Sequence, residues 1–379
     1  MEVNLVVVPP PATAPGTLAQ LVDPAVSDRI RTLSHGDLRE AVAAAEFLFE
    51  MTHASSEVTA QTKTQMLVEG ALPALCLHLS SDSAQMRSHA CRVLGEMAFR
   101  NSEVCRVITS DTMVLPKLLL MLHSNGRFDA GLVLNNCAAF CEHSCKRMVE
   151  CPGLVQKLKD MAICNNSLAR GIAIGVFNCL SRCPAVAQVL VEARVVEEAL
   201  APALCAAGKG KRHEAMRARA AMAMANLTGN VAVVDERAYL TDVAIATTVK
   251  ILGFALDGRP WGGVHFAPYS VVYPLNNLAA NPENRACLVG CGLLALTTRC
   301  INDWEHVGHN ANETLLLAIE LARRLSDGWA SPRQMQEQGL LLALHTVRDS
   351  RRGEKVSALN LLDQGVLDLV IHYAFGNDE

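Results

Sequence analysis

Apolar residues recur along most of this chain at intervals of three and four, the spacing that gathers them on one face of a helix. An Ala-rich stretch with this spacing ends repeatedly in a short apolar motif around one polar residue, as in Val93–Ala98 and Gly175–Leu180. The polar position recurs at Glu50, Glu96, Asn136, Asn178, Asn226, Asn277 and Glu320. The steps of about 40 to 51 residues are close to the periods of helical solenoids. We therefore predict an array of helical repeats.

A second landmark precedes each of these helices. Gly or Pro stands just before a Leu-rich run in Gly70–Leu75, Val114–Leu119 and Cys151–Val155, which indicates a turn followed by a new helix. Similar starts occur at Gly292, Gly339 and Gly365. Each unit is thus predicted to hold a short helix, a Leu-rich helix and a longer Ala-rich helix. Asn360 fits the spacing of an eighth repeat or belongs to a capping unit.

The first 20 residues differ from the rest of the chain. They contain Pro9, Pro10, Pro11, Pro15 and Gly16 without helical periodicity, so a mobile or extended tail is predicted there. Residues 21–379 are predicted to form the repeat domain, with about seven to eight repeats and an insertion near 257–269. The beginning of the chain lacks the patterns of a secretory signal and of a transit peptide. We expect a cytoplasmic protein, with the nucleus as the alternative compartment.

Composition supports the helical prediction. Half of the residues are apolar and only 4% are aromatic, so the core must consist of Ala, Leu, Val and Met, which favour helices over sheets. The net charge of −4 is not that of a nucleic-acid-binding domain. No apolar run approaches the roughly 18 to 20 residues that cross a bilayer.

The 14 cysteines are predicted to be reduced thiols, because residues such as Cys91, Cys179 and Cys287 occupy apolar helical positions. One metal-like cluster consists of Cys137, Cys141, His143, Cys145 and Cys151. Its helical spacing spreads the thiols around the helix, and the Cys pairs typical of zinc sites are absent. We therefore expect no metal and no cofactor.

The motif Gly70–Leu75 with the ending Leu94–Ala98, and the later stretch Leu275–Asn284, resemble armadillo repeats. The resemblance covers roughly residues 35–375 and is strongest at 56–110 and 268–298. It implies an all-α fold, a right-handed superhelical solenoid of three-helix repeats. The third helices of that family line a concave groove that binds extended protein segments. The resemblance implies no catalysis.

The asparagines of the motif are the first candidate site. The family's importin-α members hold basic peptides with a Trp four residues before the third-helix Asn, but no Trp occupies those positions here, which disfavours a nuclear-import receptor. In this chain the residues four positions before the marked polar residues are Glu46, Arg92, Leu132, Ile174, Met222, Tyr273 and Leu316. Asn136, Asn178, Asn226 and Asn277 match the family's Asn, whose amide satisfies both N–H and C=O of an extended peptide. Alternatively, each Asn caps or bridges neighbouring helices.

The segment 208–219 is a concentrated basic patch. Its basic residues are Lys209, Lys211, Arg212, His213, Arg217 and Arg219. The patch fits contact with an acidic partner or a weak nuclear-localisation signal, and it lacks the ending of a phosphate-binding loop. The interpretation favoured here is a solvated loop between helices.

The insertion at 257–269 is the least repetitive segment and is rich in Gly and Pro. Solenoid insertions form loops on one face, and Trp, Tyr and Arg are frequent interface anchors. We predict a partner-binding loop made of Arg259, Trp261, Phe266 and Tyr269. Alternatively, Trp261 and Phe266 fold back over the adjacent groove.

These patterns favour a non-catalytic scaffold or adaptor, or a structural subunit of a larger assembly such as a cytoskeletal or ciliary one. No Ser-His-Asp order, Gly-x-Ser-x-Gly motif or carboxylate pair indicates an enzyme. The expected partner is a protein, either an extended segment or a large assembly. The alternative is a chaperone-associated regulator, because some small armadillo proteins act as nucleotide-exchange factors.

Overall fold

The computed structural model of the protein describes residues 23–53, 56–124, 126–206, 208, 210–230, 242–306, 310–326, 332–340 and 342–344. Within these ranges the regular secondary structure is helical, and the single β feature is an isolated bridge between Trp261 and Val264. The all-α prediction is therefore confirmed. No described helix combines the length and apolar character needed to span a membrane. The predicted N-terminal tail, Asn360 and Gly365 lie outside the described residues.

The helices follow a three-helix repeat, as predicted. The first helices are α3 (Ser56–Val68), α6 (Ser102–Ser110), α9 (Glu142–Glu150), α12 (Pro184–Glu192), α17 (Pro282–Gly290) and α20 (Pro332–Glu337). The second helices are α1 (Pro24–His35), α4 (Ala71–His78), α7 (Val114–Leu122), α10 (Leu154–Ile163), the π-helix η1 (Val196–Leu200) with α13 (Ala201–Cys205), α15 (Asp242–Leu256) and α18 (Leu293–Asn302). The third helices are α2 (Leu38–His53), α5 (Ala84–Ala98), α8 (Arg127–Phe140), α11 (Ser167–Ser181), α14 (Lys211–Asn230), α16 (Pro268–Ala280) and α19 (Ala311–Ser326). A short 3-10 helix, η3 (Trp304–His306), follows α18.

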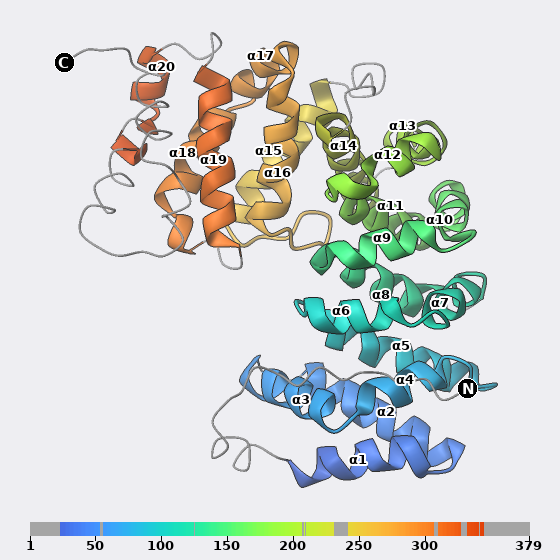
Figure 1. The fold of residues 1–379 in the computed structure, drawn as a ribbon. Helices are drawn as coiled ribbons and strands as arrows, with labels where there is room; N and C mark the ends of the chain where they lie inside the picture. Colours follow the sequence, from blue (N-terminus) through green and yellow to red (C-terminus); the bar gives the residue numbers. More distant parts are fainter. Residues whose placement is uncertain are drawn as a thin grey trace. The chain divides into compact units, whose positions relative to one another are not determined.

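The chain divides into two compact units, residues 1–157 and residues 158–379. In the first unit the third helices α2, α5 and α8 pack against one another in sequence order. In the second unit α11, α14, α16 and α19 do the same, and α14, α16 and α19 can be followed in Figure 1. Each unit therefore carries its own series of stacked third helices.

Glycines make the turns between first and second helices. Gly70, Gly153 and Gly292 precede α4, α10 and α18 with φ of 80°, 81° and 85°. This left-handed conformation suits glycine because it has no Cβ. Gly339, with φ of 72°, makes the same kind of turn after α20. The predicted turn positions are thus confirmed where the structure describes them.

Asparagine side chains start several helices. The side chains of Asn101, Asn166 and Asn281 accept hydrogen bonds from backbone N–H groups in the first turns of α6, α11 and α17. Such caps satisfy donors that the helix itself leaves unbonded and stabilise a helix by about 1 kcal/mol each. Short polar residues therefore fix where the helices begin, and apolar spacing fixes which face is buried.

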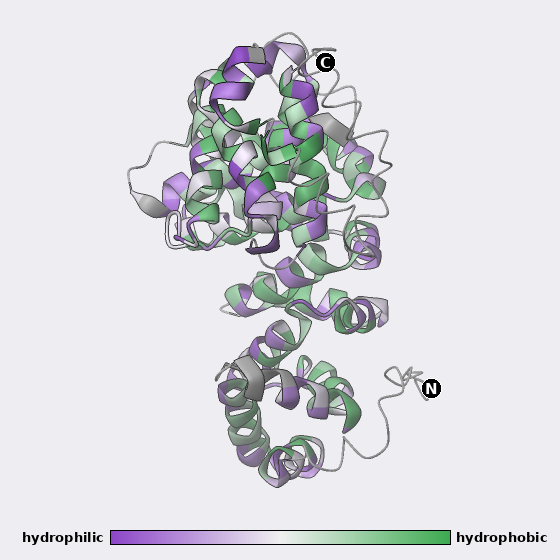
Figure 2. Ribbon diagram, turned by 90° about the vertical axis from the view of Figure 1, so that its left-hand side faces the viewer, coloured by the Kyte–Doolittle hydropathy of each residue, from purple (hydrophilic) through white to green (hydrophobic). Residues whose placement is uncertain are grey.

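The core is built mainly from small and aliphatic side chains. Hydrophobic and hydrophilic segments alternate along the helices in Figure 2, as amphipathic packing requires. Alanines such as Ala90, Ala221 and Ala225 are buried and allow third helices to approach closely. Gly95 of α5 marks one close approach, because a Cβ there would meet Leu132 of α8 at 3.1 Å.

The cysteines are part of this packing. All fourteen are thiols, and Cys91 and Cys179 are buried, whereas Cys287 is only half-buried. Burial raises the pKa of Cys76 and Cys300 to about 12, because an apolar surrounding disfavours the thiolate. These two thiols are therefore protonated at neutral pH and pack as small apolar side chains.

Candidate partner-binding face

Three of the four predicted asparagines lie on successive third helices of residues 158–379. Asn178 belongs to α11, Asn226 to α14 and Asn277 to α16, and we refer to them as the asparagine row. Asn277 Nδ2 donates to Asn226 Oδ1 at 3.3 Å, and Asn226 Nδ2 donates to Ser181 Oγ at 3.1 Å. Asn178 Oδ1 is buried and has no hydrogen-bond partner among the described residues. The row therefore combines satisfied amides with one unsatisfied acceptor.

The fourth asparagine, Asn136, belongs to α8 in the first unit. Its side chain is buried, and Nδ2 donates to the carbonyl oxygen of Gly95 in α5 at 2.8 Å. The amide thus bridges two third helices, the alternative role considered for these asparagines in the sequence. Asn226 also bridges helices, whereas the Oδ1 of Asn178 does not.

Arg219 lies on the same helix as Asn226, seven residues earlier and therefore on nearly the same face. Its Nη1 donates to the carbonyl oxygen of Gly171 in α11 at 3.5 Å, and its guanidinium lies 5.7 Å from the ring centre of Phe266. Burial lowers the pKa of Arg219. A Cβ added to Gly171 would meet no atom within 4 Å, so there is space beside this contact. The sequence placed Arg219 in the basic patch and did not group it with the asparagines, although its two-turn spacing from Asn226 indicated a shared face.

Other groups beside the asparagine row are polar or aromatic. Arg170, which precedes Gly171 in α11, has a buried Nε without a partner among the described residues. The rings of Tyr269 and Tyr273 in α16 lie 6.1 Å apart. Burial raises the pKa of Tyr269, and Arg182 opposes part of that rise. The face thus contains cations, amides and aromatic rings.

The insertion at 257–269 is divided between two surroundings. Trp261 packs edge-to-face on Phe254 of α15, with ring centres 5.0 Å apart, and Arg259 lies 4.5 Å from the centre of the same ring. Phe266 instead lies under Arg219, and Tyr269 is next to Tyr273. Only the second half of the predicted binding loop therefore adjoins the third helices near the asparagine row.

A hollow of about 540 Å³ lies between α15 and α18, close to the first half of this loop. Val249, Phe254 and Leu296 supply much of its apolar lining, and Lys250 and Asp257 add charge. Lys250 Nζ also lies 6.0 Å from the ring centre of Trp261. Trp261 Nε1 is buried without a partner in the described part of the chain. Trp261 therefore covers second-helix surface in the free protein.

The basic patch is not the solvated loop that the sequence suggested. α14 begins at Lys211, so Arg212, Arg217 and Arg219 lie on its first turns. Arg212 is exposed, while Arg217 Nη1 donates to the carbonyl oxygen of Gly208 at 3.1 Å and closes the preceding turn. Lys209 lies outside the described residues, and the side chain of Lys211 is not described. The error arose because glycines near Lys209 masked the helical spacing that starts after them.

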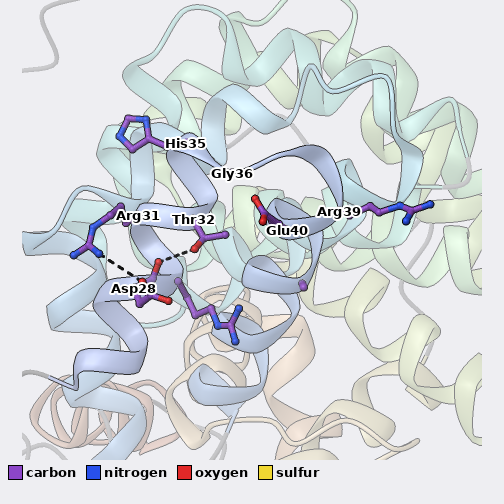
Figure 3. A pocket seen from close by; sticks show the side chains of 9 residues that line it. Asp28, Arg31, Thr32, His35, Gly36, Arg39 and Glu40 are labelled. Carbon is purple, nitrogen blue, oxygen red and sulfur yellow. Dashed lines mark hydrogen bonds and ion pairs between the residues drawn. The ribbon is translucent and has the colours of Figure 1, made fainter.

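A hollow of about 640 Å³ lies between α1 and α2 in the first unit (Figure 3). Arg31 pairs with Asp28 at 3.5 Å, and Glu40 accepts a hydrogen bond from the backbone N–H of Asp37 at 3.0 Å. The charged side chains labelled in Figure 3 are exposed, and none of the residues predicted to bind a partner lines this hollow. We do not assign it to the candidate site.

In the cysteine-rich segment of the first unit, Cys137, Cys145 and Cys151 are buried, Cys141 is half-buried and His143 is exposed. A hydrogen bond with Cys105 and burial raise the pKa of Cys137 well above its ordinary value. Cys145 Sγ donates to the carbonyl oxygen of Ala138 at 3.3 Å. Among the described residues, no three His, Cys, Asp or Glu side chains gather as metal ligands would.

Comparison with known proteins agrees with the fold. An engineered protein of known structure is 16% identical over 92% of this chain and 78% of its own, with a TM-score of 0.54. A designed armadillo repeat protein in complex with peptide (KR)4 is 14% identical over 78% of this chain and 98% of its own, with a TM-score of 0.39. No family model matches the chain, and no similar curated protein is found. The described residues form a helical repeat protein built from three-helix units.

Proposed function

We propose that this protein is a non-catalytic scaffold that holds an extended segment of another protein on the third helices of residues 158–379. The asparagine row carries the proposal. Three successive third helices carry an amide at equivalent positions: Asn277 is half-buried, Asn178 Oδ1 has no hydrogen-bond partner among the described residues, and the buried Asn226 links Asn277 to α11. An amide both donates and accepts, so it can bond the N–H and C=O groups of an extended backbone.

The aromatic groups beside the row extend this proposal. Phe266, Tyr269 and Tyr273 are half-buried; Phe266 precedes α16, Tyr269 lies in its first turn and Tyr273 in its middle. Half-buried aromatic rings add contact area at little cost in conformational entropy, which is why they are frequent interface anchors. The bound main chain would contact the amides, and its side chains would contact these rings. Arg259 and Trp261 would form a separate contact over α15.

The broader role follows from the same surface. A scaffold or adaptor needs only a stable binding face, and a structural subunit needs such a face towards its neighbours in an assembly. We propose a cytoplasmic role of this kind, in a cytoskeletal or ciliary assembly. The free thiols fit a reducing compartment, and repeat architecture supports the assembly role.

Site-specific photo-crosslinking tests the proposal. A benzophenone amino acid replaces Tyr273, beside the row, in the full chain expressed in its native cells. The matched control replaces Val189 of α12, whose side chain is 40% exposed. We expect the probe at position 273 to attach to one defined segment of a partner, identified by mass spectrometry, and the probe at position 189 not to attach to it. The same attachment pattern from both positions would contradict the proposal.

A further inference from the structure

Arg219 is a positive charge that no carboxylate balances in the described structure. Its one hydrogen bond goes to a carbonyl oxygen at 3.5 Å, although a guanidinium has five N–H donors. Other arginines of the same unit are paired: Arg299 lies 2.7 Å from Asp257, and Arg324 lies 2.8 Å from Glu320. Arg219 lacks such a partner among the described residues, as does Arg217, which bonds only backbone carbonyl oxygens.

The third helices on either side of Arg219 contain no acidic residues. α11 and α16, which pack on α14, have none, and α14 itself has only Glu214. Glu320 of α19 occupies the position equivalent to the asparagines, but Arg323 and Arg324 already bind it at 2.7 Å and 2.8 Å. Glu313 of α19 is exposed and lies near Tyr269. The described third helices of this unit therefore supply no spare carboxylate to Arg219.

We propose that the partner segment held on these third helices is acidic, and that Arg219 recognises one of its carboxylates. This inference rests on the scaffold function proposed above and names the chemistry of the partner. Arginine binds a carboxylate through two parallel N–H donors, which gives direction as well as charge. The space beside Gly171 is where such a carboxylate can approach the guanidinium.

The groups around Arg219 fit this role. Phe266 lies against the guanidinium and shields it from water, which strengthens a charge pair. Asn178 lies two helical turns after Gly171 in α11, so its amide is on nearly the same face as the proposed carboxylate position. An extended acidic segment would thus place a side chain on Arg219 and its backbone along the asparagine row.

Three labelled twelve-residue peptides test the inference with the full-length protein. Each alternates Gly or Ser with one repeated residue, which is Glu, Gln or Lys, and binding is followed by fluorescence anisotropy. We expect the Glu peptide to bind about tenfold more tightly than the Gln peptide at low ionic strength, as a charge-assisted hydrogen bond permits. Screening should reduce this preference at about 0.3 M salt.

Substitutions at Gly171 and Arg219 test whether the guanidinium binds a carboxylate of the peptide. Gly171→Glu puts a carboxylate beside Arg219, and Gly171→Ala fills the same space without charge. Gly171→Glu and Arg219→Gln should both lower affinity for the Glu peptide to that for the Gln peptide. Gly171→Ala should keep the preference, and Arg219→Lys should keep part of it. Circular dichroism melts confirm that each variant is folded.

The outcomes separate this inference from the scaffold function. Equal binding of the Glu and Gln peptides, or tighter binding of the Lys peptide, would overturn the acidic partner and leave a peptide-binding face. A Gly171→Glu variant that binds the Glu peptide like the parent would also overturn it. Failure of all three peptides to bind would overturn the inference, and the crosslinks from position 273 would then decide the scaffold function separately.

Discussion

Asp129 and Arg219 occupy equivalent positions in two third helices and carry opposite charges. Each lies seven residues before the asparagine of its helix, Asp129 in α8 and Arg219 in α14. The carboxylate of Asp129 accepts a hydrogen bond from Ser88 of the preceding third helix. Arg219 reaches a carbonyl oxygen of Gly171 at 3.5 Å and has no carboxylate partner in the described structure. Both side chains therefore reach the preceding third helix, Asp129 at a side-chain hydroxyl and Arg219 at a single carbonyl oxygen that leaves its other N–H donors unused.

Other polar side chains of the first unit, like Asp129, contact a side chain of a neighbouring helix. Lys63 and Glu96 lie 3.6 Å apart with their side chains mostly covered, and the guanidinium of Arg92 lies 3.8 Å from the ring centre of Phe49. His89 is an exception, because its buried Nδ1 has no partner among the described residues. Equivalent repeat positions can therefore either bond a side chain of the neighbouring helix or leave polar groups unused. The difference lies in which neighbouring side chain is available.

Asn226→Ala, which removes an amide bonded on both sides, is expected to have the largest effect on stability. Asn226 is fully buried, donates to Ser181 Oγ and accepts from Asn277 Nδ2. Its loss leaves two polar partners and a small cavity, so we expect the free energy of unfolding to fall by about 2 to 4 kcal/mol. Urea denaturation measures it. Asn178→Ala is the control and should cost less than half as much, because Asn178 Oδ1 has no bond to lose. Equal losses would contradict the division between satisfied and unsatisfied amides.

Trp261→Ala has the next largest expected effect. Because the indole packs on Phe254 at 5.0 Å, its removal should lower the free energy of unfolding by about 1 to 2 kcal/mol. Truncating the exposed His265 in the same loop should leave stability unchanged. Thermal unfolding of the two variants makes the measurement. If Trp261→Ala unfolds at the temperature of the parent, the indole is free to serve as an anchor for a partner.

Two glycine substitutions are expected to have the smallest effects on the free energy of unfolding. Gly171→Ala adds a methyl group into open space within a helix, so we expect a gain of about 0.5 to 1 kcal/mol from helix propensity. Gly95→Ala in α5 adds the same group 3.1 Å from Leu132, which should cancel that gain. Chemical denaturation compares them. A larger gain for Gly95→Ala would show that the first unit is packed less tightly than the distances indicate.

Much of the fold follows from local sequence. Apolar spacing predicted the third helices around Asn178 and Asn226, and glycine predicted the turns at Gly70 and Gly292. These features depend on a few neighbouring residues and on backbone conformations that glycine favours. The insertion near 257–269 was predicted for the same reason, since Gly and Pro interrupt helical spacing there. Prediction works well for a repeat protein because the same apolar spacing and glycine turns recur in each repeat.

The candidate site was less predictable, because it depends on contacts between repeats. The sequence grouped Arg219 with Arg212 and Arg217 as one basic patch. In the structure Arg219 bonds to a neighbouring third helix, whereas Arg217 closes the turn before α14. Nor does spacing reveal that Trp261 packs on Phe254, seven residues earlier in the chain. Which polar side chain finds a partner is decided by residues about 40 to 50 positions away, beyond any local pattern.

The sequential packing of third helices within each unit has a consequence for how the chain is made. In residues 158–379, α14 packs on α11, α16 on α14, and α19 on α16, so each helix finds its main partner among residues already synthesised. Loop closure over such short separations costs little entropy, and chains rich in local contacts fold quickly. Folding can therefore propagate from repeat to repeat while synthesis at the ribosome continues, and a nascent chain exposes at most one unpaired apolar face at a time.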